Sequence, residues 1–80
     1  MYTVYAIKSI NRNYIYVGMT KDLDVRFLRH NGGYERTTKP YRPFKLIFTE
    51  TCDSRSKARE REKYLKSGIG KEFLKNLIKK

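Results

Sequence analysis

Two runs of aromatic and β-branched residues stand near the start of the chain. They are YTVYAIK at 2–8 and YIYVG at 14–18, and the short segment INRN lies between them. Residues of these types favour extended backbone, and two such runs joined by a short loop are typical of a β-hairpin. We therefore expect two antiparallel strands at the start of the chain.

A helix is expected to follow the hairpin, over residues 21–31. Thr20 is the predicted N-cap, and Asp22 and Asp24 fall in the first turn, where the positive end of the helix dipole favours acidic side chains. Gly32 follows the last turn and predicts where the helix ends. We interpret the two aspartates as partners of the dipole and not as metal ligands.

The remaining elements complete an α+β fold. FKLIFTE at 44–50 predicts a third strand, and Ser54 or Ser56 is expected to cap a second helix that ends at Gly68. KEFLKNLI predicts a third helix near the end of the chain. The order is then ββαβαα, with a small three-stranded antiparallel sheet flanked by helices. Eighty residues predict a single domain, 1–80.

Positive charge is the most pronounced feature of the composition. The 80 residues include 19 Lys and Arg against 8 Asp and Glu, a formal net charge of +11. The excess is concentrated in residues 54–80, which hold ten basic and three acidic side chains. Such a balance favours a polyanionic partner, nucleic acid in first place, over a surface that serves solubility alone.

Neither the cysteine content nor the hydropathy indicates an oxidising compartment or a membrane. Cys52 is the one cysteine, so no internal disulfide can form, and we interpret it as a small hydrophobic core residue. No apolar run is as long as a signal-peptide core or a membrane span. These features predict a cytoplasmic protein that does not enter a membrane.

The hairpin register fixes the direction of two tyrosines. With INRN as a four-residue loop, Ile7 pairs with Tyr16 and Tyr5 pairs with Gly18, so Tyr5 and Tyr16 lie diagonally on one face of the sheet. Gly18 then leaves an opening beside Tyr5 through which a ligand can approach the backbone. Ordinary cross-strand packing of the two rings is the alternative.

Arg26 and His30 stand four residues apart in the first helix, so they project from one face, one turn apart. A phosphate suits this pair, because a guanidinium offers two parallel donors and an imidazole can donate a hydrogen bond or move a proton near neutral pH. Solvated surface residues are the alternative.

Glu62 is expected to lie on the inner side of the second helix. It falls four residues after Ala58 and three before Leu65, whereas Glu60 is on the solvent side. A carboxylate that faces inward is costly unless it is paired or binds a cation. The sequence leaves two explanations, a salt bridge to Arg26 or a divalent metal such as Mg²⁺.

Together these positions resemble the GIY-YIG nuclease superfamily. TVY at 3–5 and YVG at 16–18 resemble the two halves of its signature, with Thr3 in place of the first glycine. Arg26, His30 and Glu62 follow in the order and approximate spacing of its other active-site positions. The resemblance spans nearly the whole chain and is closest to the small stand-alone members named after the N-terminal domain of the excinuclease C subunit.

The resemblance implies a metal-dependent endonuclease that cuts phosphodiester bonds in DNA with one divalent cation. It implies that Glu62 holds Mg²⁺ or Mn²⁺ and that Arg26 adds a second positive contact to the same phosphoryl group. Tyr5 is the first choice for orienting or deprotonating the attacking water, with Tyr16 and His30 in support. Because an ordinary tyrosine has a pKa of about 10, Tyr5 and His30 both stay candidates for the general base.

Two other classes of protein fit the same residues. A DNA- or RNA-binding module without catalysis, acting with a partner, would use the basic surface and the tyrosines and would not need Glu62 to face inward. A small protein-interaction domain would make the charge incidental. Relatives of this kind usually take their specificity from other modules, so a partner protein is a candidate here, as is a role in DNA repair.

Overall fold

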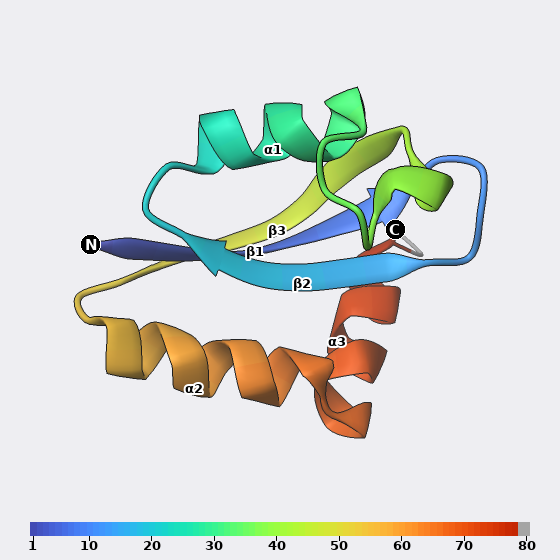
Figure 1. The fold of residues 1–80 in the computed structure, drawn as a ribbon. Helices are drawn as coiled ribbons and strands as arrows, with labels where there is room; N and C mark the ends of the chain where they lie inside the picture. The colour runs from blue at the N-terminus through green and yellow to red at the C-terminus, as the bar shows by residue number, and fades with distance from the viewer. Residues whose placement is uncertain (79–80) are drawn as a thin grey trace.

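A three-stranded sheet lies between one helix and a pair of helices in the computed structural model, which describes residues 1–78 (Figure 1). The elements are β1 (Tyr2–Ser9), β2 (Ile15–Thr20), α1 (Leu23–Gly32), a 3₁₀ turn η1 (Lys39–Tyr41), β3 (Phe44–Cys52), α2 (Arg55–Lys66) and α3 (Gly68–Ile78). The predicted α+β class and the order ββαβαα are confirmed. No helix within residues 1–78 is long and apolar enough to cross a membrane.

β1 is the central strand, and both of its neighbours are antiparallel to it, in the order β2-β1-β3. The predicted hairpin register is confirmed, since Tyr5 lies opposite Gly18 and Ile7 lies opposite Tyr16. The backbone N–H of Ser9 closes the loop by donating to the Tyr14 carbonyl at 2.9 Å. β2 is consequently an edge strand, with one side paired and the other open.

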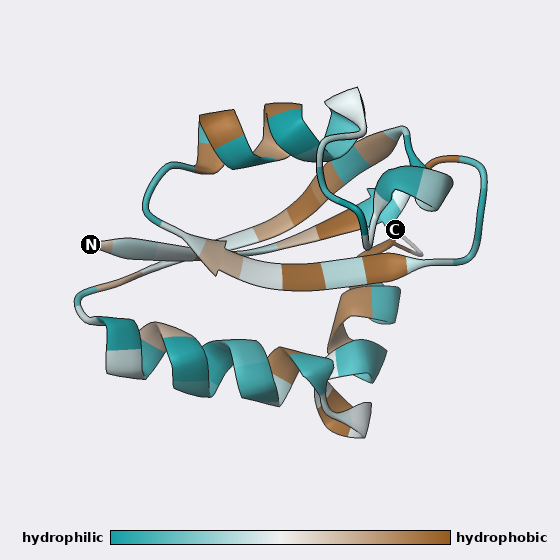
Figure 2. Ribbon diagram, in the orientation of Figure 1, coloured by the Kyte–Doolittle hydropathy of each residue, from teal (hydrophilic) through white to brown (hydrophobic). Residues whose placement is uncertain are grey.

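The two faces of β1 belong to two different cores. Val4 and Ala6 face α2 and α3, where they pack with Leu65 and Leu74 in an apolar cluster that includes the buried Cys52. On the other face, under α1, Tyr5 and Ile7 pack with Phe44. Figure 2 shows that α2 consists mostly of hydrophilic residues. The core under α1 also contains polar groups, and the candidate site is built there.

The ends of α1 differ from the prediction by one or two residues. Asp22 is the N-cap, and its carboxylate accepts a hydrogen bond from the Val25 N–H at 3.2 Å. Thr20 cannot take that place because its backbone is still paired with Thr3 in the sheet. At the other end, Gly33 adopts the left-handed conformation (φ 80°), so it and not Gly32 provides the cap that favours glycine.

The prediction that the second helix ends at Gly68 is also wrong. Ser54 caps α2 as expected, but α2 ends at Lys66, and Gly68 is the first residue of α3. Gly70 permits the tight junction, since a Cβ atom there would overlap the backbone carbonyl oxygen of Tyr64. This junction directs α3 back toward the sheet.

Candidate functional site

Three polar side chains are buried together between the sheet and α1. Tyr5 and Thr38 are fully buried and His30 is 1% exposed. The Tyr5 hydroxyl lies 2.9 Å from Nε2 of His30, and Nδ1 of His30 lies 2.7 Å from Oγ1 of Thr38. The Thr38 hydroxyl donates to the backbone carbonyl of Glu35 at 3.4 Å. These contacts form one continuous hydrogen-bonded chain.

We assign the direction of the protons in this chain from its Thr38 end. With the Thr38 proton directed to the Glu35 carbonyl, Oγ1 accepts from an N–H at Nδ1 of His30. Burial lowers the pKa of His30, opposed by Glu35 and aided by Arg26 and Arg29, so the ring is neutral near pH 7 and carries one proton. With this assignment Nε2 carries no proton, and the Tyr5 O–H donates to it.

Tyr5 keeps its proton in the resting protein. Burial, with Tyr16 in support, raises the pKa of Tyr5, and the nearby Arg26 opposes the shift. The predicted opening beside Gly18 is not open, because the ring of Tyr5 itself fills it. A Cβ atom at Gly18 would lie 2.8 Å from the Tyr5 hydroxyl oxygen. Gly18 thus gives room to the phenol and not to a ligand.

Arg26 and Glu62 line a hollow at the end of β2, between α1 and α2, of about 610 Å³; we call it the Arg26 hollow. The side chain of Glu62 is 16% exposed, so it faces inward as the helix pattern predicted. Its ion pair is with Lys66 at 3.3 Å, and Arg26 forms no ion pair within residues 1–78. The salt bridge between Arg26 and Glu62, one of the two explanations considered above, is therefore absent.

Tyr16 lies between the buried chain and the surface. Its ring centroid is 6.3 Å from that of Tyr5 and 5.0 Å from that of His30, and the side chain is half-buried. Within residues 1–78 its hydroxyl makes no hydrogen bond, so of the two predicted supports for Tyr5 only His30 provides one. The diagonal placement of Tyr5 and Tyr16 on one face is confirmed.

The predicted site residues thus lie at two depths. Tyr5 and His30 are inside, Arg26 and Glu62 line the Arg26 hollow, and Tyr16 is next to both groups. Arg26 and His30 do not face one ligand as their spacing predicted, because both nitrogens of His30 are engaged within the protein.

Thr38 is the site residue that the sequence did not single out. A threonine in a loop rich in polar residues carries no signal of burial. The one local hint is that Glu35 and Thr38 stand three apart, the spacing of a helical turn.

A metal at this site would rely on few protein ligands. Within residues 1–78 no group of three or more His, Cys, Asp or Glu is placed to hold a metal ion. Glu62 does fit Mg²⁺, which is commonly bound through one or two carboxylates, water and substrate phosphate oxygens. In the structure the Lys66 ammonium contacts this carboxylate, where a metal ion would otherwise bind.

Comparison with known proteins gives the family of this chain. Residues 1–76 match the family described as the GIY-YIG catalytic domain. The chain is 36% identical over 73 residues to a UPF0213 protein of Staphylococcus epidermidis, covering 90% of this chain and 88% of that protein.

Two further staphylococcal proteins give similar matches. A UPF0213 protein of Staphylococcus saprophyticus is 36% identical over 62 residues, 76% of each chain. One of Staphylococcus haemolyticus is 34% identical over 73 residues, 90% of this chain and 88% of that protein. No solved structure is a significant match. The chain belongs to the GIY-YIG nuclease family.

Proposed function

We propose that this protein is an endonuclease that hydrolyses phosphodiester bonds in DNA with one divalent cation held by Glu62. The observation that carries the proposal is the Arg26 hollow, in which a guanidinium without an ion pair among residues 1–78 and an inward carboxylate share one space without pairing to each other. A phosphate bound to a divalent cation suits both groups. The guanidinium can donate hydrogen bonds to the phosphate oxygens, and the carboxylate can bind the cation. The net charge of +11 supports a polyanionic substrate.

Each side chain has a distinct role in this proposal. Glu62 would hold Mg²⁺ or Mn²⁺, which supplies Lewis-acid stabilisation of the charge that develops on the phosphate and the leaving oxygen. Arg26 orients the same phosphoryl group by donating to its non-bridging oxygens. Lys66 must release Glu62 when the cation arrives, and as a cation it can then contact a phosphate itself.

The buried chain gives the reaction a route for a proton. His30 is neutral and bare at Nε2, so it can take the Tyr5 proton as Tyr5 takes one from the attacking water. In this scheme Tyr5 and His30 act together as the general base. Tyr5 contacts the attacking water, and His30 accepts the proton that Tyr5 passes on. Because Tyr5 is fully buried, a shift of the Arg26 or Tyr16 side chain has to uncover the phenol when substrate binds.

Plasmid nicking tests the proposed function. Purified protein with supercoiled plasmid or a branched DNA duplex is expected to produce nicked or cut product in Mg²⁺ or Mn²⁺ and none in EDTA. Equal cutting in EDTA would contradict the metal role of Glu62. Tight, salt-sensitive binding with no cutting under any metal would instead favour the non-catalytic binding module, for which the Lys66 contact to Glu62 is the supporting observation.

Thr38→Val is expected to change which nitrogen of His30 carries the proton. The substitution keeps the shape but removes the acceptor of the Nδ1 N–H, so the proton should move to Nε2, which can then donate to Tyr5. The chain contains 1 histidine, so the imidazole ¹⁵N signals in an NMR spectrum belong to His30. Cleavage should fall by about tenfold or more, because Nε2 no longer accepts the Tyr5 proton.

Thr38→Ser is the matched control, since it keeps the hydroxyl. It should retain the wild-type ¹⁵N pattern and most of the activity. If Thr38→Val still shows a protonated Nδ1, Thr38 does not set the tautomer of His30, whatever the effect on cleavage. A protonated Nε2 in the wild-type protein would contradict the assigned direction of the protons.

A further inference from the structure

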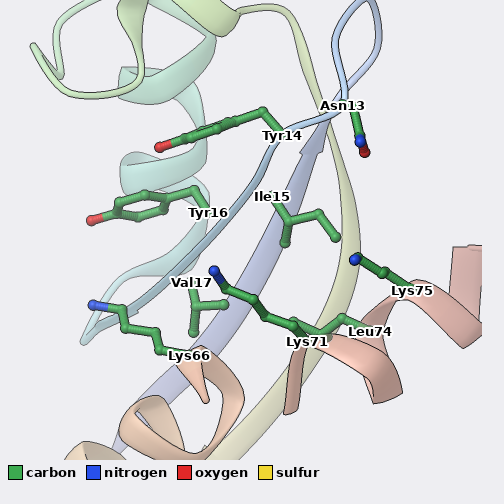
Figure 3. A pocket seen from close by; sticks show the side chains of 9 residues that line it. All are labelled: Asn13, Tyr14, Ile15, Tyr16, Val17, Lys66, Lys71, Leu74 and Lys75. Atoms are coloured by element: carbon green, nitrogen blue, oxygen red, sulfur yellow. The ribbon is translucent and has the colours of Figure 1, made fainter. Parts of the chain in front are cut away.

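A second hollow continues along the open edge of β2, where the strand meets α3 (Figure 3). Its volume is about 510 Å³, and its polar side chains are Asn13, Tyr14, Tyr16, Lys66, Lys71 and Lys75; we call it the lysine groove. Lys66 lines this groove and the Arg26 hollow alike, so the two hollows adjoin at this residue. Lys71, Lys75 and Tyr14 of this groove take no part in the mechanism proposed above.

Among residues 1–78, the charged side chains that line the lysine groove are all positive. Lys66, Lys71 and Lys75 extend toward β2, as Figure 3 shows, and no carboxylate of these residues lines the groove. Lys71 and Lys75 stand one turn apart on the same flank of the buried Leu74, so the packing of α3 fixes their direction. Within residues 1–78 neither of the two makes an ion pair. The groove is therefore suited to an anionic ligand.

The open edge of β2 adds backbone donors to the groove. The Tyr14 carbonyl is bonded to β1 and Tyr16 lies opposite Ile7, so alternate residues of β2 direct their backbone groups toward β1. The backbone N–H groups of Ile15 and Val17, which line the groove, point the other way. Backbone N–H groups commonly bind phosphate oxygens of nucleic acids.

Tyr14 places a flat ring beside these donors. The ring stacks on Tyr41, with centroids 3.9 Å apart and planes at 9°, which holds it in position, and Tyr14 also lines the groove. Aromatic rings stack on the bases of single strands. A duplex keeps its bases paired inside and its phosphates outside. Only an unpaired nucleotide can therefore offer a base and a phosphate to the same groove.

We propose that the lysine groove binds an unpaired segment of a nucleic-acid strand, with phosphates on the three lysines and the edge N–H groups and a base against Tyr14. The inference rests on the proposed function, because the bound segment continues into the Arg26 hollow, where the phosphate to be cut is held. The preferred substrate is then branched or single-stranded nucleic acid and not continuous duplex. An acidic peptide that adds to the β2 edge would lack this continuity.

The test is a binding measurement in EDTA, so that it does not depend on cleavage. Fluorescence anisotropy is recorded with a labelled single strand, a duplex with a single-stranded flap, a blunt duplex of the same sequence and an oligoglutamate peptide. Lys71→Ala with Lys75→Ala is compared with Lys57→Ala with Lys63→Ala, which removes the same charge from α2 outside the groove. Tyr14→Leu is compared with Tyr14→Phe, which keeps the ring.

We expect wild-type protein to bind the single strand and the flap at least tenfold more tightly than the blunt duplex. The groove double variant should lose about tenfold or more in single-strand affinity, and its salt slope should be shallower by about 1.4, the value for two lost phosphate contacts. The α2 double variant should change affinity less than threefold. Tyr14→Leu should lose about tenfold and Tyr14→Phe little.

Three results would overturn the proposal. One is an equal loss of affinity in the two double variants, which would mean that only net charge matters. Another is blunt duplex bound as tightly as the flap. The third is oligoglutamate binding that the groove double variant abolishes, which would assign the groove to an acidic protein. Metal-dependent nicking by the wild-type protein would stand in each case, so failure here is distinct from failure of the proposed function.

Discussion

Glu62→Gln is expected to lower the rate of metal-dependent cleavage by at least about 100-fold, because the cation supplies several kcal/mol of charge stabilisation and each 1.36 kcal/mol is tenfold in rate. Glutamine keeps the size of the side chain but removes the charge that holds a divalent cation. Nucleic-acid affinity in EDTA should change less than about threefold, since most of the cationic surface is untouched. Single-turnover cleavage and anisotropy measure the two quantities.

Glu60→Gln is the matched control for this prediction. It makes the same change of charge on the same helix, two residues away, on the exposed side of α2. Stability should barely change in either variant, because the lost contact to Lys66 is an i, i+4 pair whose lysine is 53% exposed. Cleavage by Glu62→Gln at the wild-type rate would remove Glu62 from the metal site.

Tyr5→Phe is expected to slow cleavage by about 100-fold, within the range that general acid–base groups contribute. It removes the hydroxyl that donates to His30 and keeps the ring that fills the space over Gly18. The free energy of unfolding should fall by about 1–3 kcal/mol, because Nε2 of the buried His30 loses its partner. Rates are therefore compared at a temperature where the folded fraction, measured by circular dichroism, is complete.

The pH dependence separates chemistry from structure in this variant. Burial lowers the pKa of His30, so the wild-type rate should decline only as the pH drops below the ordinary histidine value of about 6.5, where Nε2 begins to be protonated. That acid limb should be lost in Tyr5→Phe, which has no proton to pass to His30. If Tyr5→Phe keeps both the wild-type rate and the acid limb, Tyr5 is not the group that takes a proton from the attacking water.

The same histidine links acidity to folding. Its pKa is lower in the folded chain than in the unfolded chain, so the unfolded state binds the additional proton first. The contribution of neutral His30 to stability is therefore complete above about pH 6.5 and declines as the pH falls below that value. Glu35, which is held ionised by Arg29, reduces the shift.

The positions that the sequence predicted well are those set by local periodicity. The hairpin register followed from the length of one loop, and the inward direction of Glu62 followed from its spacing to Ala58 and Leu65. Both rest on geometry that a strand or a helix imposes on any sequence. Tertiary contacts do not alter them.

The positions that the sequence predicted poorly depend on competition between neighbours or on contacts distant in the chain. Thr20 and Asp22 both suit an N-cap, and only the length of β2 decides between them. Thr38 acquires its role because η1 and α1 enclose it beside a histidine eight residues away. The sequence around Gly68 is typical of a helix end. In the structure Gly68 begins α3, because Gly70 lets α3 start close against the end of α2.

The open edge of β2 has a consequence for the behaviour of the protein in solution. An uncovered strand invites a strand from another molecule to add to the sheet, which leads to fibres and precipitates. Lys66, Lys71 and Lys75 surround that edge with like charge, so two copies repel each other where they would otherwise join. The cations that we propose bind a polyanion are thus also expected to oppose the addition of a second copy at this edge.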